Sequence, residues 1–252
     1  MTNQARSKNR LTSGITKYSA EATVTEAELI NPAMRHIRIV ADEPITFDYQ
    51  PGQHIRVQIN DPLSLRGILR PGETLRTYTI WDFHSDGRTI DLRVHLYNGD
   101  GIGLRWARDT KPGDRVTFWW PRGDFFTRDA ACHLFVGEET ASAAFGPMLR
   151  ALDPSAVVTG VLESECAEHD LPMPGGHDLV RVHRGTVSAA SSATLLAAVA
   201  DLELPGTPGA AYVAGEARTC QAVRDFLVRE RGWPRTGIKV KPFWVPGKRG
   251  LH

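Results

Sequence analysis

The strictest alternation of apolar and polar residues in the chain runs Thr89-Ile90-Asp91-Leu92-Arg93-Val94-His95-Leu96. Successive side chains of a β-strand point to opposite faces, so Ile90, Leu92 and Val94 share one face, and the polar residues between them share the other. The stretch predicts a strand that lays one face on a core. The same pattern recurs through the first half of the sequence.

The first half contains four similar stretches, at residues 35–40, 53–59, 75–81 and 115–120. Turn-forming pairs such as Pro51-Gly52 and Pro71-Gly72 separate them. Short strands with turns at this spacing predict a small antiparallel barrel or sandwich. Within it, only residues 104–109 have a helical pattern.

The pattern changes near residue 130, where strands begin to alternate with helices. Strands are predicted at residues 133–136, 156–162, 179–183, 211–214 and 238–244, and helices at 140–152, 191–202 and 216–231. This alternation predicts a mostly parallel sheet that binds ligands at its carboxyl edge. The boundary between the halves is predicted near residues 125–130.

The composition argues against several classes of protein. Of the 252 residues, 41% are apolar and 23% are charged, as in ordinary globular proteins, and no apolar run is long enough to span a membrane. Lys and Arg number 30 against 29 Asp and Glu, and a net charge of +1 disfavours a nucleic-acid or membrane-surface binder. Three scattered cysteines suit a reducing compartment and form no zinc ribbon. We therefore expect a cytoplasmic protein.

The strongest local signal for chemistry is Arg76-Thr77-Tyr78-Thr79. A guanidinium can bond a diphosphate with two N–H groups, a phenol can lie against a flat ring, and a hydroxyl can bond a ring nitrogen. The three side chains together therefore suit one phosphorylated aromatic ligand. Taken alone, the tetrapeptide is better explained as an ordinary strand.

Motifs before and after this strand strengthen the signal. The glycine turn Gly101-Ile102-Gly103-Leu104-Arg105-Trp106-Ala107 opens a short helix and can present backbone N–H groups to a phosphate. In the second half, Val136-Gly137-Glu138-Glu139-Thr140-Ala141 and Val213-Ala214-Gly215-Glu216 each stand where a strand gives way to a helix. Neither is the dinucleotide fingerprint G-x-G-x-x-G.

In this order, the motifs resemble the siderophore-interacting protein family, the FAD-binding ferric-siderophore reductases of the ferredoxin-reductase-like superfamily. The resemblance extends from about Tyr18 to the ending Phe243-Trp244-Val245-Pro246-Gly247. It implies an antiparallel FAD-binding β-barrel, residues 15–127, followed by a Rossmann-like α/β domain for NAD(P)H, residues 128–252.

The resemblance also implies roles for matching positions. Its cofactor-binding positions are Arg76, Tyr78, Thr79, Ile80, Asp91, His95, Gly101, Ile102, Gly103, Leu104, Thr140, Ala141, Gly215, Glu216 and Arg218. Those in the first half hold FAD, and those in the second half close over the flavin or flank the nicotinamide nucleotide. His95 fits a strand histidine without a ligand equally well, and Arg218 fits a solvated helix start. Trp106 and Trp244 are expected to be packing residues.

The sequence departs from the family pattern in three places. Ile80-Trp81 replaces Pro-Arg after the R-x-Y-T strand, Gly101-Ile102-Gly103-Leu104 replaces Gly-Pro-Ala-Ser, and Glu138 replaces Asp. The lost arginine and serine weaken the expected diphosphate site unless Arg105 or Arg122 compensates. We expect these changes to leave the fold intact but to affect which substrate is bound.

The reaction implied by the resemblance is reduction of a ferric siderophore or another ferric chelate. NADH or NADPH, or alternatively a ferredoxin, supplies electrons, and the flavin passes them singly to Fe(III), which is released as Fe(II). Outer-sphere transfer needs no catalytic acid, base, nucleophile or resident metal. We expect the protein to act as a monomer.

The C-terminal segment is basic and contains no acid. Lys239, Lys241, Lys248 and Arg249 could bind an anionic chelate, and a solvated basic tail explains them equally well. Two other functions stay open. One is a flavin oxidoreductase acting on an organic metabolite, which Trp81 near the flavin would favour. The other is a protein that binds flavin or a ferric siderophore without turnover.

Overall fold

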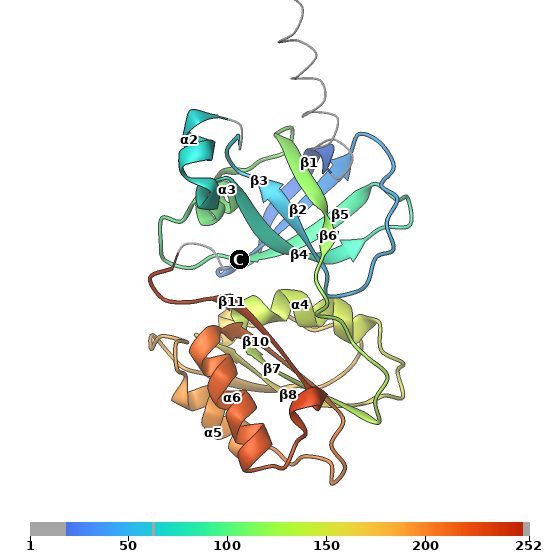
Figure 1. Ribbon diagram of the computed structural model, residues 1–252, viewed down its shortest axis with the longest axis vertical. Coiled ribbons are helices and arrows are strands. Elements are labelled where there is room, and N and C mark those ends of the chain that lie inside the picture. The colour runs from blue at the N-terminus through green and yellow to red at the C-terminus, as the bar shows by residue number, and fades with distance from the viewer. Residues whose placement is uncertain (1–18, 62–63, 249–252) are drawn as a thin grey trace, which may run out of the picture.

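The computed structural model describes residues 19–61 and 64–248, and it consists of a closed barrel followed by an open sheet (Figure 1). The barrel strands are β1 (Ser19–Asn31), β2 (Met34–Ala41), β3 (His54–Gln58), β4 (Leu75–Phe83), β5 (Thr89–His95) and β6 (Arg115–Arg122). They pair antiparallel in the order β1-β2-β5-β4-β3-β6, and β6 closes the barrel on β1. The barrel also carries α2 (Leu65–Leu69), a short 3₁₀ helix (Pro71–Glu73) and α3 (Ile102–Asp109).

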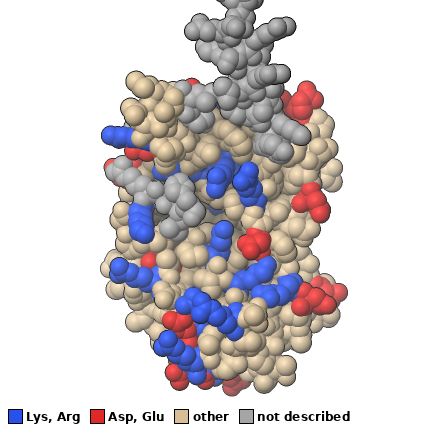
Figure 2. Space-filling model, in the orientation of Figure 1, with Lys and Arg blue, Asp and Glu red and all other residues tan. Residues whose placement is uncertain are grey.

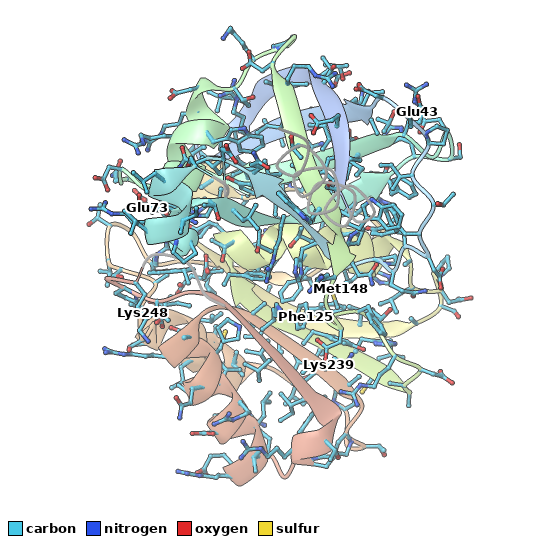
Figure 3. The ribbon with its side chains drawn as sticks, turned by 45° about the horizontal axis from the view of Figure 1, so that its top comes forward. Glu43, Glu73, Phe125, Met148, Lys239 and Lys248 are labelled. Atoms are coloured by element: carbon cyan, nitrogen blue, oxygen red, sulfur yellow. The ribbon has the colours of Figure 1, made fainter. Side chains whose placement is uncertain are left out.

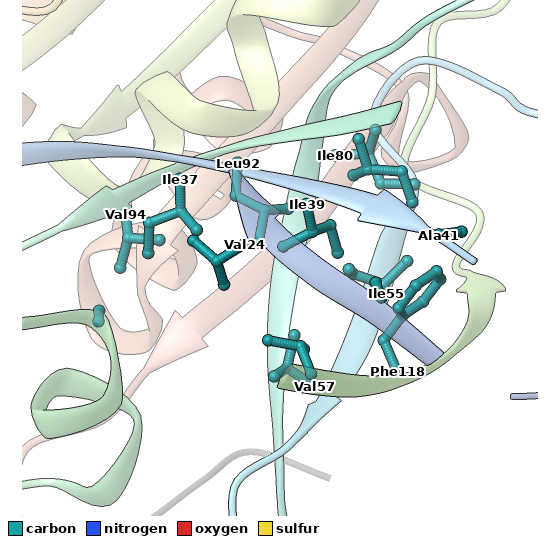
Figure 4. Close-up of a cluster of buried hydrophobic side chains, with 14 of the residues drawn as sticks. Val24, Ile37, Ile39, Ala41, Ile55, Val57, Ile80, Leu92, Val94 and Phe118 are labelled. Atoms are coloured by element: carbon teal, nitrogen blue, oxygen red, sulfur yellow. The ribbon is translucent and has the colours of Figure 1, made fainter. Parts of the chain in front are cut away.

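The barrel interior is filled by the apolar face of each strand (Figure 4). Ile90 and Leu92, from the stretch that opens the sequence analysis, are fully buried, and Val94 is 7% exposed. Each large aliphatic side chain buried in this way stabilises the fold by roughly 1.5–3 kcal/mol. The same core contains Val24, Ile37, Ile39, Ile55, Val57, Ile80, Val116 and Phe118.

The second half is an α/β layer structure. Its elements are β7 (Cys132–Glu138), α4 (Glu139–Arg150), β8 (Val157–Ser164), a 3₁₀ helix (Ala167–His169), β9 (Val180–His183), α5 (Ala193–Asp201), β10 (Ala210–Glu216), α6 (Ala217–Arg229), a 3₁₀ helix (Arg235–Gly237) and β11 (Ile238–Trp244). The sheet order is β11-β10-β7-β8-β9, with every pair parallel. Helix α4 covers one face of the sheet, and α5 and α6 cover the other.

The predicted fold class is confirmed: an antiparallel barrel precedes a parallel α/β sheet. Among the strands and α-helices of the described residues, β1 and α2 were not expected from the sequence. Strand β1 buries only small or sparse apolar residues such as Ala22 and Val24 between threonines and glutamates, so its period-2 pattern is weak. It nevertheless pairs with both β2 and β6, which closes the barrel.

Helix α4 lies between the barrel and the sheet and packs on β4 and β5 (Figure 1). The ring of Trp81 lies directly on Gly146, where a Cβ atom would come within 2.1 Å of Trp81 Cζ3. The guanidinium carbons of Arg93 and Arg150 lie 5.3 and 5.5 Å from the centre of the same ring. Trp81 is therefore a buried contact between the two halves.

The helices and the cysteine thiols agree with the fold described above. Across the described residues, no helix combines the length and the apolar character that a membrane crossing requires. Cys132, Cys166 and Cys220 are all free thiols, and Cys132 and Cys220 are buried.

Gly146→Ala tests the contact between the halves. An alanine normally stabilises a helix interior, but here its methyl group would overlap the Trp81 ring, so we expect the free energy of unfolding to fall by about 1–3 kcal/mol. Chemical denaturation of Gly146→Ala and of Gly206→Ala, where a Cβ atom meets nothing within 4 Å, provides the comparison. Equal stability of the two variants would contradict the described packing.

Candidate functional site

The N-terminal end of α3 lies against β4. The phenol of Tyr78 donates a hydrogen bond to the Gly103 carbonyl oxygen at 2.8 Å, and its ring lies 5.0 Å from that of Trp106, centre to centre. A Cβ atom on Gly103 would lie 2.8 Å from Cγ of Arg76 and 2.9 Å from the Tyr78 oxygen. The turn can approach the strand this closely because residue 103 is a glycine and has no side chain. Two motifs that are distant in sequence meet here.

This junction suits a diphosphate. No side chain caps the start of α3 and its first turn contains no acid, which suits an anion at the backbone N–H groups of that turn. Arg76 lies beside the turn, with Nη1 donating to the carbonyl oxygens of Gly72 and Leu75 at 2.7 Å. Ile102 and Leu104 have buried side chains, so they offer backbone groups only.

A cavity of about 270 Å³ adjoins the junction. Its lining residues are Ile59, Asn60, Ile102, Arg105 and Trp106. The exposed Arg105 follows the glycine turn, so its charge is available where the family's serine is missing.

The remaining residues of the β4 motif face different surroundings. Ile80 is fully buried in the barrel core, its N–H donates to Gln53 O at 3.0 Å, and its carbonyl accepts from Tyr49 at 3.2 Å. Its side chain fills the core instead of facing a ligand. Strand alternation turns Thr79 to the opposite face, the one that presents Trp81 to the second half.

Asp91 and His95 lie on the face of β5 opposite to the barrel core, and the ring of His95 lies 6.2 Å from that of Tyr97, centre to centre. Asp91 accepts hydrogen bonds from Nε and Nη2 of Arg38 at 2.7 and 3.0 Å and approaches His84 Nε2 at 3.1 Å. Burial opposes its ionisation, but these contacts outweigh burial and lower the pKa of the carboxyl. Asp91 thus belongs to an ion-pair network on the barrel wall.

The ring of His95 is directed toward the second half, where Glu139 and Arg184 influence its charge. Burial lowers the pKa of His95, and its Nδ1 atom is buried without a hydrogen-bond partner in the described structure. The structure therefore places His95 at the contact between the halves.

Buried carboxylates line the carboxyl edge of the sheet. Glu138 ends β7, Glu163 stands next to the end of β8, and Glu216 ends β10, and each side chain is 2% exposed or less. Arg184 approaches two acids here, with Nη1 at 2.8 Å from Glu139 and 3.7 Å from Glu163. Open α/β sheets generally bind their ligands in a crevice just outside this edge.

The carboxylates of this edge titrate differently. Burial, followed by the charge of Glu139, raises the pKa of Glu138 to about 7. Burial would also raise that of Glu139, but its hydrogen bond from Arg184 prevails and its pKa is lowered. Glu216 behaves similarly, because backbone N–H groups at the start of α6 outweigh burial and lower its pKa.

The other predicted residues of the second half surround Glu138 or lie near it. Thr140 donates to Glu138 through both its backbone N–H, at 2.9 Å, and its hydroxyl. Ala141 is fully buried against Gly137, so only its backbone could meet a ligand. Gly215 has a φ of +123°, and Arg218 is exposed in the first turn of α6.

The predicted basic segment is divided by the fold. Lys239 donates to the carbonyl oxygen of Asp124, and its ammonium lies 4.4 Å above the Phe126 ring, so it contacts the linker between the halves. Lys248 lies past the other end of β11 and is exposed (Figure 3). Arg249 lies outside the described residues.

Lys241 belongs to a basic cluster that the sequence did not reveal. Its charge, with those of Arg56 and Arg122, acts on His54, and the four residues come from β3, β6 and β11. Figure 2 shows Lys and Arg side chains of both halves on this side of the molecule. No local motif links positions so far apart. Burial first, and then these cations, lower the pKa of His54 to about 4.

Asp82, His84 and Asp91 have ligand atoms close enough together to hold a metal ion. Arg150 pairs with Asp82 at 3.0 Å, and Arg38 pairs with Asp91 at 2.7 Å. Because both carboxylates already face guanidinium groups, we assign this cluster to ion pairing.

Two family profiles match the chain. The profile of the siderophore-interacting FAD-binding domain matches residues 23–125, and that of the siderophore-interacting protein matches residues 130–247. Among curated proteins, ferric vibriobactin reductase ViuB of Vibrio cholerae is 25% identical over 240 residues, covering 87% of this chain and 86% of ViuB. The mycobactin import ATP-binding/permease protein IrtA of Mycolicibacterium smegmatis is also 25% identical, over 90% of this chain but only 26% of its own length.

Solved structures share the fold. A siderophore utilization protein from T. fusca superposes with a TM-score of 0.79 at 24% identity, covering 93% of this chain and 95% of that one. The siderophore-interacting protein SipS from Aeromonas hydrophila superposes with a TM-score of 0.75 at 24% identity, covering 92% and 93%.

His54 should make stability depend on pH. Its folded pKa lies below the ordinary 6.5, so the folded state resists protonation, and stability is lost as pH falls from 6.5 toward 4. Between pH 7 and pH 4.5 we expect wild type to lose about 2 kcal/mol more than His54→Gln in urea denaturation. Lys241→Gln should show an intermediate loss. Identical pH dependence of wild type and His54→Gln would contradict this assignment.

Proposed function

Because the chain belongs to the siderophore-interacting protein family, we propose that it is an FAD-dependent ferric-chelate reductase that takes electrons from NAD(P)H and releases iron from a siderophore as Fe(II). The observation that carries this proposal is the junction of Arg76, Tyr78 and Gly103, where a strand and an open helix turn meet. A cytoplasmic location, a monomeric state and the domain bounds 15–127 and 128–252 are part of the proposal.

The residues of the first half fit FAD. The α3 turn and Arg76 would hold the diphosphate, with Arg105 as a second cation at the adjoining cavity. Tyr78 keeps the turn in place through its bond to Gly103, and Thr79 faces the second half. Bound FAD would convert a two-electron donor into single-electron transfers to Fe(III).

The second half would receive the nicotinamide nucleotide at its carboxyl edge. The crevice lies between β7 and β10, where the chain order of the sheet reverses. Gly215 and the first turn of α6, including Arg218, lie on one side of it, and the first turn of α4 lies on the other. Helix α4, which begins at this edge, packs on β4 of the barrel, so both proposed cofactor sites would lie near one boundary (Figure 1).

The ferric chelate would bind on the basic side of this boundary. Lys241, Arg56 and Arg122 form a cationic cluster across both halves, and Lys248 extends the charge along the chain. Lys239 is already engaged by Asp124 and Phe126, so its contribution is to structure. The cluster suits an anionic chelate, because clustered cations raise the local concentration of an anion.

FAD retention tests the cofactor site. We expect purified wild type to be yellow, and Arg76→Ala or Tyr78→Ala to weaken FAD binding about 10- to 100-fold, because each removes a contact at the diphosphate junction. Thr77→Ala is the matched control, since Thr77 is exposed on the other face of β4. The measurement is FAD fluorescence during titration of apoprotein. A wild type that takes up no FAD would refute the proposed function.

Charge reversal tests the substrate site. Lys241→Glu with Lys248→Glu should slow reduction of ferric EDTA, an anion, about tenfold at low salt and leave reduction of neutral ferric acetylacetonate nearly unchanged. Rising ionic strength should mimic the variant, because exposed charges are screened over about 8–10 Å. Stopped-flow absorbance separates this step from flavin reduction by NADH or NADPH.

Lys111→Glu is the control for that experiment, because Lys111 is exposed on the barrel beside Asp114 and outside the basic cluster. Equal slowing for both chelates would assign Lys241 and Lys248 to folding. An effect limited to flavin reduction would assign them to the nucleotide site. A flavoprotein that binds ferric chelates but never reduces them would indicate a carrier.

A further inference from the structure

Glu138 joins three elements, β7, α4 and β11, at the carboxyl edge of the sheet. It ends β7, and its Oε2 atom accepts the backbone N–H of Thr140 in the first turn of α4 at 2.9 Å. Its Oε1 atom accepts the Thr140 hydroxyl and also the indole N–H of Trp244, at 2.9 Å. Trp244 is the last residue of β11, two strands away from β7.

The indole reaches Glu138 by crossing the end of β10, the strand between them. Residue 215 of that strand is a glycine with a φ of +123°, and a Cβ atom there would come within 2.6 Å of Glu138 Oε1. Glycine at this position therefore leaves the space that the bond between Glu138 and Trp244 occupies. The bond spans the point where the chain order of the sheet reverses, which is where such sheets bind their ligands.

The strength of this bond depends on the charge of Glu138. Its contacts with Trp244 and with the backbone of Thr140 are to N–H groups, which donate and cannot accept. An ionised carboxylate satisfies both, and a bond to a charged acceptor is roughly twice as strong as one between neutral groups. A protonated carboxyl must donate its own O–H to the Thr140 hydroxyl oxygen. The indole N–H is then left with a neutral oxygen of Glu138, which is a weaker acceptor than a carboxylate.

The groups around Glu138 allow its carboxyl to be either ionised or protonated near neutral pH. Glu139 on α4 repels the charge of Glu138, and Arg184, which follows β9, attracts it. From α6 the facing group is the thiol of Cys220, whose own pKa is raised by burial and by nearby acids, so it stays uncharged. Burial has the largest effect, and with the charge of Glu139 it outweighs the hydrogen bonds from Thr140 and Trp244 and raises the pKa of Glu138 to about 7.

We propose that Glu138 is a proton-controlled positioning residue for Trp244: ionised, it holds the indole across the crevice between β7 and β10, and protonated, it releases the indole. The part of this inference that concerns catalysis rests on the proposed function, because the crevice is where NAD(P)H would bind. Release of Trp244 would then widen access for the donor, so donor binding would strengthen as pH falls.

The indole N–H signal of Trp244 tests the proposal without any cofactor chemistry. In ¹H–¹⁵N NMR spectra of the full-length protein, the signal lost in Trp244→Phe identifies it. We expect it to move with a single midpoint near pH 7 in wild type and to be independent of pH in Glu138→Gln. Glu163→Gln is the matched control: Glu163 is buried on the neighbouring strand and bonds Ser192 instead of an indole, so the Trp244 titration should persist.

A Trp244 signal that does not titrate in wild type, or that titrates identically in Glu138→Gln, would overturn the proposal. The second measurement is NADH binding to the flavin-loaded protein, for which we expect the Kd to rise about fivefold from pH 6 to pH 8.5 in wild type and to stay level in both Glu138→Gln and Trp244→Phe. A wild-type Kd independent of pH would overturn the role in donor access. Failure of NADH and NADPH to reduce the flavin at any pH would count against the proposed function, while the indole titration would still decide the role of Glu138.

Discussion

The contact of Trp81 with Gly146 is the one on which the arrangement of the two halves depends. A helix residue without a side chain lets the indole lie directly on α4, and Arg93 and Arg150 lie close to the same ring. Arg150 also pairs with Asp82, which anchors the helix to β4. Because α4 begins at the carboxyl edge of the sheet, the helix that binds the barrel also brings that edge to the boundary. The two proposed cofactor sites would both lie near this boundary for this reason.

Four buried carboxylates gather at the carboxyl edge of the sheet. Glu138, Glu139, Glu163 and Glu216 are all nearly inaccessible, and burying a carboxylate is costly unless hydrogen bonds or cations compensate. Helix N-termini compensate Glu216, and Arg184 compensates Glu139. Burial and the charge of Glu139 raise the pKa of Glu138 to about 7, so conditions near neutrality can change its charge. The chemistry of the crevice therefore follows from how unevenly its acids are paired.

Much of the fold was predictable from local pattern. The alternation at residues 89–96, the periodicity of the second half and the serine before α5 predicted elements that the structure contains, because each signal is carried by neighbouring residues. Closure of the barrel was not predictable, because it depends on β1, whose pattern is weak, pairing with β6 almost a hundred residues later. The residues of the diphosphate junction were predicted from motifs, yet their meeting depends on Gly103 admitting Arg76 and Tyr78.

The sequence by itself determined the class of fold, the family resemblance and which residue types stand at each turn. Only the tertiary structure decided their partners. In the tertiary structure, Trp81 forms the contact between the halves, Lys239 binds the linker, and His54 lies among cations from three strands. The physical reason is that burial and charge depend on what surrounds a side chain. Strand pairing and helix packing bring those surroundings from distant parts of the chain, whereas periodicity and turn preference act between neighbours.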